Sequence, residues 1–216
     1  MQLNDYTLTA PAVSTNSVAL AQTLGAAGNL VLNGSTVVNG VAVLGVGYMV
    51  GVTLTFAASE VGHNFTITGT DYGGNVISEI IAGTTAGTVD TANDYATITQ
   101  ISVASATTGN VSVGNVNQAV GRWVVADKNK ANFQVGFGCY VTGSVFYSIQ
   151  HTWQDVLSQP TTAANQRIFY HDFVVNQSTT QDSNYAFNIA AFRLVITSGT
   201  GSVELMSLEA GAGPGF

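Results

Sequence analysis

The chain carries three histidines, twelve carboxylate side chains and one cysteine, which are residue types that bind metals or act in acid–base catalysis. Their spacing matches no motif for either chemistry. His171 and Asp172 are adjacent on a predicted strand, so their side chains would point to opposite faces of a sheet. His151, Trp153 and Asp155 share one strand parity, but no motif places a nucleophile or a second carboxylate beside them. We therefore expect no catalytic, cofactor-binding or metal-binding residues, and we expect that the chain is not an enzyme.

Aromatic side chains of the C-terminal half allow two interpretations. Trp153, Tyr147, Phe169 and Tyr170 could form a platform for a sugar ring, because aromatic faces beside amide and carboxylate groups suit carbohydrates. In a β-sandwich, however, most aromatic side chains belong to the core. The single cysteine, Cys139, lies in an alternating apolar run and is predicted to be a small buried hydrophobe.

The charges divide the chain into two parts. The first 121 residues contain six acidic and no basic residues, a net charge of −6, whereas the remainder contains six acidic and five basic residues, a net charge of −1. Composition also changes from Thr, Val and Gly to heavier aromatic residues. These steps predict two modules joined near residues 116–122.

Composition also limits the partners. Charged residues make up 8% of the chain, against roughly a quarter in ordinary soluble proteins, which favours an assembly subunit that buries its surface against neighbours. An acidic balance with five scattered cations argues against nucleic acid. No apolar run reaches the roughly 18 residues of a membrane span, and the first residues lack the basic region of a secretory signal.

The hydrophobic pattern predicts an all-β fold. Short runs that alternate apolar residues with Thr, Ser or Asn recur about every ten residues, with turn residues such as Asn39-Gly40 between them. We predict two β-sandwich, jelly-roll-like modules, residues 23–117 and 118–216. Residues 1–22 are predicted to form an extended N-terminal arm.

Several local elements follow from the same pattern. We predict a hairpin of residues 133–141 and 145–153, a strand over 167–175, and a closing pair of strands, 192–196 and 203–208, whose Gly199-Thr200-Gly201 connection is a hairpin turn. Residues 16–24 and 183–190 are the only helix candidates.

Three groups of strings in the chain resemble virion structural proteins of tailed bacteriophages. The resemblance covers most of residues 22–210 and lies in turn-and-strand patterns, so it transfers no catalytic residues. These strings are QTLGAAGNLVLNG (22–34), FTITGTD (65–71) with GNVISE (74–79), and YAF (185–187) followed by FRLVITSGTGSV (192–203).

The resemblance implies a capsid decoration, or cement, protein. Such a subunit would oligomerise, as a homotrimer or homodimer, on the head surface of a virion made in the host bacterial cytoplasm, and would bridge subunits of the major capsid protein. Leu3, Tyr6 and Leu8 of the arm would anchor it to a neighbour, so deleting residues 1–12 should weaken binding without unfolding the chain. The alternative is a tail or fibre module that binds a host-surface glycan through Trp153.

Overall fold

The computed structural model describes residues 2–127 and 131–212, and all its regular elements are β-strands. The predicted all-β class is therefore confirmed. Within these residues no helix is long and apolar enough to cross a membrane.

The chain forms two compact units. The N-terminal unit comprises Pro11–Asn117 and the short segment Pro160–Ala163; the C-terminal unit comprises the described residues of 1–10, 118–159 and 164–216. The segment 160–163 belongs to the N-terminal unit because its backbone is hydrogen-bonded there. The Asp71 carboxylate accepts Thr161 N–H at 2.9 Å, and the Asn93 side chain accepts Ala163 N–H at 2.8 Å.

Two antiparallel sheets make up the N-terminal unit. One is a six-stranded sheet in the order β4-β5-β10-β7-β8, with β3 paired to β10; in the other, β9, β6, β11 and β2 follow one another. The strands are β2 (Ser14–Gln22), β3 (Gly28–Asn29), β4 (Val37–Val38), β5 (Val41–Val43), β6 (Tyr48–Phe56), β7 (Asn64–Thr70), β8 (Val76–Ala82), β9 (Gly87–Tyr95), β10 (Thr97–Val103) and β11 (Val111–Asn115).

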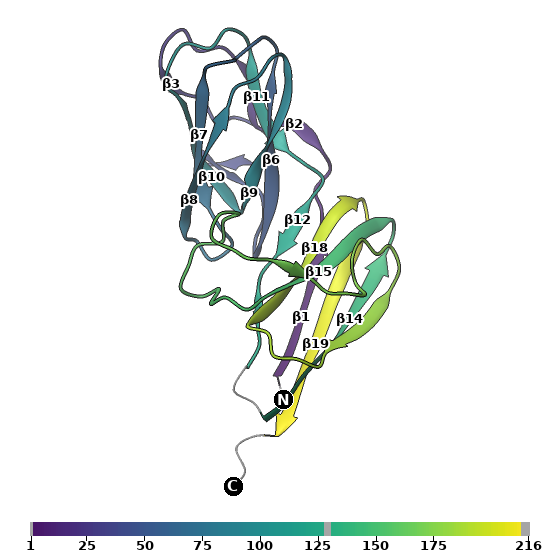
Figure 1. Cartoon of the computed structure of the whole chain (residues 1–216). Helices are drawn as coiled ribbons and strands as arrows, with labels where there is room; N and C mark the ends of the chain where they lie inside the picture. Colours follow the sequence, from purple (N-terminus) through teal and green to yellow (C-terminus); the bar gives the residue numbers. More distant parts are fainter. Residues whose placement is uncertain (1, 128–130, 213–216) are drawn as a thin grey trace. The chain divides into compact units, whose positions relative to one another are not determined.

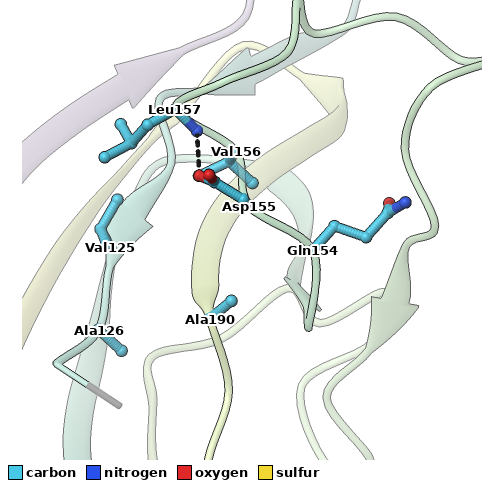
Figure 2. A pocket seen from close by; sticks show the side chains of 7 residues that line it. All are labelled: Val125, Ala126, Gln154, Asp155, Val156, Leu157 and Ala190. Carbon is cyan, nitrogen blue, oxygen red and sulfur yellow. Dashed lines mark hydrogen bonds between the residues drawn. The ribbon is translucent and has the colours of Figure 1, made fainter. Parts of the chain in front are cut away.

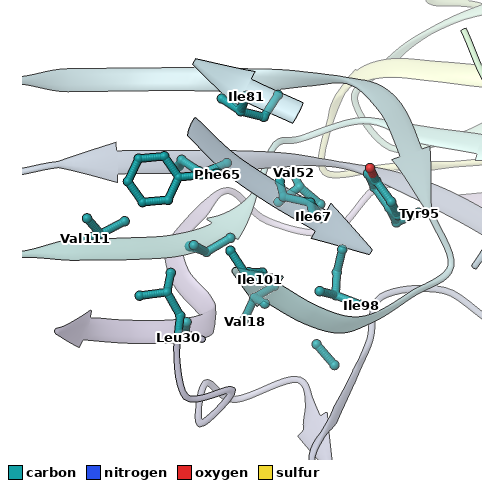
Figure 3. Close-up of a cluster of buried hydrophobic side chains, with 14 of the residues drawn as sticks. Val18, Leu30, Val52, Phe65, Ile67, Ile81, Tyr95, Ile98, Ile101 and Val111 are labelled. Atoms are coloured by element: carbon teal, nitrogen blue, oxygen red, sulfur yellow. The ribbon is translucent and has the colours of Figure 1, made fainter. Parts of the chain in front are cut away.

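The core of the N-terminal unit lies between these sheets. Figure 3 shows Val52 and Val111 from one sheet gathered with Phe65 and Ile67 from the other, all four fully buried. The rings of Phe56 on β6 and Phe65 on β7 lie 5.1 Å apart, which places the sheets face to face. Burying each such side chain contributes about 1.5–3 kcal/mol, so this core is the main source of the unit's stability.

The predicted Asn39-Gly40 turn is confirmed. Asn39 and Gly40 have φ angles of 53° and 81°, and Val38 pairs with Val41 on either side of them. Two successive positive φ values define a two-residue hairpin turn whose twist matches that of the strands.

The C-terminal unit also contains two antiparallel sheets. The first has the order β1-β19-β14-β17; in the second, β16, β15, β18 and β12 follow one another and β13 also pairs with β18 (Figure 1). The strands are β1 (Gln2–Thr9), β12 (Ala119–Gly121), β13 (Val124–Val125), β14 (Ala131–Thr142), β15 (Val145–Thr152), β16 (Phe169–Tyr170), β17 (Gln181–Tyr185), β18 (Ala191–Gly199) and β19 (Ser202–Ala212).

Side chains alternate along β14, so one face of the strand is buried in the core and the other lies on the outer surface. Phe137 and Cys139 point inward, and the Phe137 ring lies 6.1 Å from Phe192 on β18 of the facing sheet. Cys139 is fully buried, as predicted, and burial raises the pKa of its thiol to about 12. Gly136 and Gly138 lie on the outer face. The unit is thus a two-sheet sandwich, while its jelly-roll-like connectivity stays a prediction.

Residues 1–22 differ from the predicted arm. Residues Gln2–Thr9 form β1, which pairs along its whole length with β19 in the same chain, and Leu8 is only 1% exposed. Residues Ser14–Gln22 form β2 of the N-terminal unit. The segment is extended but does not project, because its period-2 apolar residues find partners within the chain. Deleting residues 1–12 would therefore disrupt the C-terminal unit, contrary to the prediction from sequence.

The two predicted hairpins are also wrong. β14 and β15 belong to different sheets, as do β18 and β19. Their connections are arches from one sheet to the other, and they lie side by side: the Ser144 carbonyl accepts the N–H groups of Thr200 and Gly201, both at 2.9 Å. Alternation shows which face a residue occupies but not which strand lies beside it. The pattern therefore fits a hairpin within one sheet and an arch between two sheets equally well.

Three further local predictions are corrected. The helix candidates 16–24 and 183–190 overlap β2 and β17, because sheet pairing overrides their weak local preference. The predicted strand 167–175 is reduced to β16, and the residues after it bond the free edge of β15, as in Ile149 N–H to Val174 O at 2.9 Å.

Candidate functional site

The outer surface of the β1-β19-β14 sheet exposes apolar side chains. Leu3, Met206 and Leu208 are 70%, 40% and 42% exposed, respectively. They border a shallow groove of about 270 Å³, to which Gly136 and Gly138 also contribute. We call these five residues the apolar face. Exposed apolar side chains that adjoin one another are a feature of protein–protein contact surfaces.

The two glycines keep this face flat. A Cβ atom at Gly136 would meet only the Leu208 carbonyl oxygen, and one at Gly138 only the Met206 Cε atom, both at 4.0 Å. Neither glycine has a positive φ angle. The fold therefore has no steric need for glycine here, and the missing side chains leave room for a surface that packs against the sheet.

Acidic residues flank the apolar face. The strand register places Asp5, Met206, Gly138 and Asp182 in one row across the sheet, with the carboxylates at its two ends. Both aspartates are exposed, and Glu204 lies two residues from Met206 on β19. The face is apolar in the middle and negative at its margins.

A second feature is a pocket of about 270 Å³ at an edge of the C-terminal sandwich. It lies where the chain crosses from β16, beside β15, to β17, beside β14. Residues that line it include His151, His171, Asp172, Ser183 and Phe187. The pocket is built by a connection that leaves one sheet and joins the other.

His171 is held in one tautomer by its neighbours. The backbone N–H of Phe173 donates to Nδ1 at 3.3 Å, so Nε2 carries the proton. Nε2 lies 3.2 Å from the Asn184 carbonyl oxygen and 3.3 Å from Ser183 Oγ, both of which can accept it. The Ser183 hydroxyl proton is then available to another acceptor.

His151 presents a nitrogen atom without a partner. Its Nδ1 atom lies 3.3 Å from the hydroxyl of Tyr185, which is fully buried. In the described ranges no group hydrogen-bonds its Nε2 atom, although the side chain is only 5% exposed. Burial lowers the pKa of His151, and the nearby His171 lowers it further while Asp172 raises it, so the imidazole is neutral at neutral pH.

Aromatic rings surround His151, and one of them, Phe187, lines the pocket. The Trp153 ring lies 5.0 Å from His151, 4.7 Å from Phe169 and 6.2 Å from Phe187. Trp153, Phe169 and Phe187 are 53%, 44% and 48% exposed. The Trp153 Nε1–H donates to the Asn188 carbonyl at 2.8 Å, which fixes the indole ring. We call these three residues the aromatic rim.

A smaller pocket lies beside Ala190 in the same unit (Figure 2). Its volume is about 50 Å³, enough for water but not for a ligand ring. Asp155 lines it, and its carboxylate accepts Leu157 N–H at 3.0 Å, which stabilises a turn. Asp155 lines this small pocket and not the one that contains His151.

The structure separates the residues predicted to interact with a partner. Leu3 joins the apolar face, whereas Tyr6 and Leu8 point to the other side of β1. The Tyr6 hydroxyl accepts Leu194 N–H at 3.1 Å and donates to the Arg122 carbonyl at 3.4 Å, and burial raises its pKa. Trp153 lies at the aromatic rim.

The sugar platform suggested by the sequence is only partly assembled. Tyr147 is fully buried and its hydroxyl donates to the Thr179 carbonyl at 2.8 Å, so it belongs to the core. Trp153 and Phe169 are neighbours, as the sequence suggested, and His151 lies beside Trp153, whereas Phe187 was not recognised as their partner. The missed signal on the apolar face was Met206 and Leu208, apolar residues on the outward parity of β19.

No group of three or more His, Cys, Asp or Glu side chains among the described residues is arranged to hold a metal ion. No protein-family model matches the chain, and neither a curated protein nor a solved structure matches it.

Proposed function

We propose that the chain is a non-enzymatic structural protein of a bacteriophage virion, a capsid decoration protein that binds the major capsid protein on the head surface. The observation that carries the proposal is the apolar face with its acidic margin. The phage-like strings in residues 22–34, 65–79 and 185–203 support the same assignment.

The acidic margin favours a different protein as the partner of this face. The chain has a net charge of −7, and Asp5, Asp182 and Glu204 surround the apolar residues. A second copy docked by the same face would bring like charges together, which opposes binding. A capsid surface with Lys or Arg around an apolar centre complements it. The predicted homodimer or homotrimer would then form through another surface.

A low charge density suits such a contact. With 8% charged residues, the chain can bury surface without stripping water from many ions. Fully burying Leu3, Met206 and Leu208 would contribute at most about 1.5–3 kcal/mol each. A single contact is therefore weak, and occupancy of the head depends on copies that are joined and act together.

The test is co-sedimentation of purified protein with phage heads that lack it. Leu3→Asp places a charge in the apolar face on the edge strand β1, where the side chain is 70% exposed. We expect this variant to fold normally and to bind heads at least tenfold more weakly.

The matched control is Ile80→Asp. Ile80 is 66% exposed on β8, the edge strand of the six-stranded sheet in the N-terminal unit. We expect it to bind heads like the unmodified protein. Normal binding by the Leu3 variant would overturn the role of the apolar face.

A further inference from the structure

The pocket at the edge of the C-terminal sandwich lies apart from the apolar face and has its own chemistry. Its polar groups are the imidazole of His151, the hydroxyl of Ser183 and the carboxylate of Asp172. Of the half-exposed aromatic rim, Phe187 lines the pocket, while Trp153 contacts Phe187 and Phe169 contacts His151. Polar and apolar contacts thus converge in one concave site, as in sites for small ligands.

The charges of the pocket exclude an anionic ligand. Its one carboxylate, Asp172, would repel an anion, and none of the described lining residues is Lys or Arg. His151 is buried and its environment disfavours the protonated form. A neutral ligand rich in hydroxyl groups avoids this penalty and can hydrogen-bond the carboxylate.

Two hydrogen-bonding residues that line the pocket favour a polyhydroxylated ring. Nε2 of His151 has no hydrogen-bond partner in the described ranges. Because His171 donates its Nε2 proton, the Ser183 hydroxyl can donate its own proton to a ligand. A quaternary ammonium ion, a common ligand of aromatic cages, has neither a donor nor an acceptor and would bond neither group. A hydroxyl group both donates and accepts, so it satisfies either.

The size of the pocket limits the ligand to about one ring. Its volume of about 270 Å³ lies just below the usual range for small-molecule sites, about 300–1,000 Å³. The rings of Trp153 and Phe187, 6.2 Å apart, provide apolar faces beside the polar groups. A pyranose ring has apolar C–H faces and a hydroxyl periphery, and so matches both.

We propose that this pocket binds a neutral monosaccharide unit, with its hydroxyls on His151, Ser183 and Asp172 and a ring face against the aromatic rim. The site shares no lining residue with the apolar face and does not depend on the decoration role. On a particle it would bind surface glycans while the apolar face holds the shell.

The experiment is saturation-transfer-difference NMR and calorimetry on the full chain, with a panel of neutral methyl glycosides of glucose, galactose, mannose and N-acetylglucosamine. We expect at least one to bind with millimolar affinity. Phe187→Ala should weaken it about tenfold, and Ser183→Ala should weaken it without changing the fold. Both side chains lie at the pocket, and Phe187 is half exposed, so its loss leaves the core intact.

Phe146→Ala is the matched control, because Phe146 is a similarly exposed phenylalanine, 42%, outside the pocket lining. It should bind the glycosides normally. Failure of every glycoside to bind, equal binding by the Phe187 variant, or preferential binding of tetramethylammonium would overturn the proposal. The Leu3→Asp variant should keep glycoside binding, so this outcome and that of the head-binding test are independent.

Discussion

Hydrogen bonds, more than charge attraction, set the pKa of the buried residue Glu60. Glu60 is fully buried, yet Oε1 accepts Gly109 N–H at 2.8 Å and Oε2 accepts from His63 Nδ1 at 2.7 Å. Burial by itself raises the pKa of the carboxyl group. The hydrogen bonds from Gly109, His63 and the Thr108 backbone outweigh it and hold the pKa below the ordinary value of 4.5.

This lowered pKa predicts acid sensitivity of the N-terminal unit. A carboxyl group that binds its proton more weakly in the folded state stabilises the fold above its unfolded pKa, and this stabilisation is lost as the pH falls below about 4.5. We expect Glu60→Gln to lower the free energy of unfolding by about 1–3 kcal/mol at neutral pH, and by less near pH 3. Urea unfolding followed by far-ultraviolet circular dichroism measures both.

Asp90→Asn is the control for this prediction, since Asp90 is an exposed carboxylate on β9 of the same unit. It should change stability by less than about 0.5 kcal/mol at either pH. An equal loss at neutral pH and pH 3 for Glu60→Gln would show that the carboxylate charge is not the cause.

At the scale of strands, β1 is a structural element of the C-terminal unit. Leu8 is 1% exposed and Leu3 is 70% exposed on the same strand. Leu8→Ala should lower the free energy of unfolding by about 2–5 kcal/mol, whereas Leu3→Ala should change it by less than about 0.5 kcal/mol. Deleting residues 1–12 should be worse than either substitution.

Tryptophan fluorescence measures these effects, because both tryptophans, Trp123 and Trp153, lie in the C-terminal unit. Equal stability of the two leucine variants would contradict the pairing of β1 with β19. That result would instead support a free N-terminal arm, as the sequence predicted.

The strands also show what could be learned from sequence. Alternation in residues 133–139 correctly predicted the buried face of β14, and Asn39-Gly40 correctly predicted a hairpin turn. The partners of β14 and β15 could not be predicted, because a turn between two strands fits a hairpin and an arch equally well.

The pocket could not be predicted from the sequence, for a related reason. His151 and His171 meet through Tyr185, whose ring centroid lies 5.2 Å and 4.9 Å from theirs. These three residues come from β15, the turn after β16, and β17. Only the path of the connection between two sheet edges brings them together, and that path depends on long-range pairing. The sequence indicated only that His151 and Trp153 share a face of one strand and that Phe169 is a further candidate aromatic residue.

For the molecule as a whole, the proposed functions depend on two surface features of the C-terminal unit. The C-terminal unit carries the apolar face on the outside of one sheet and the pocket at a sandwich edge. The N-terminal unit contributes a separate core and, with five acidic and no basic residues, most of the net negative charge. In our proposal the apolar face binds one partner protein, and the pocket binds a second, smaller ligand.

The most direct test of the decoration role is electron microscopy of phage heads that lack the protein, after addition of the purified chain, together with a heat-stability assay of the heads. The account predicts regularly spaced density on the shell and heads that withstand a higher temperature. Absence of bound protein, or density confined to the tail, would contradict it, and tail density would favour the glycan-binding fibre module instead.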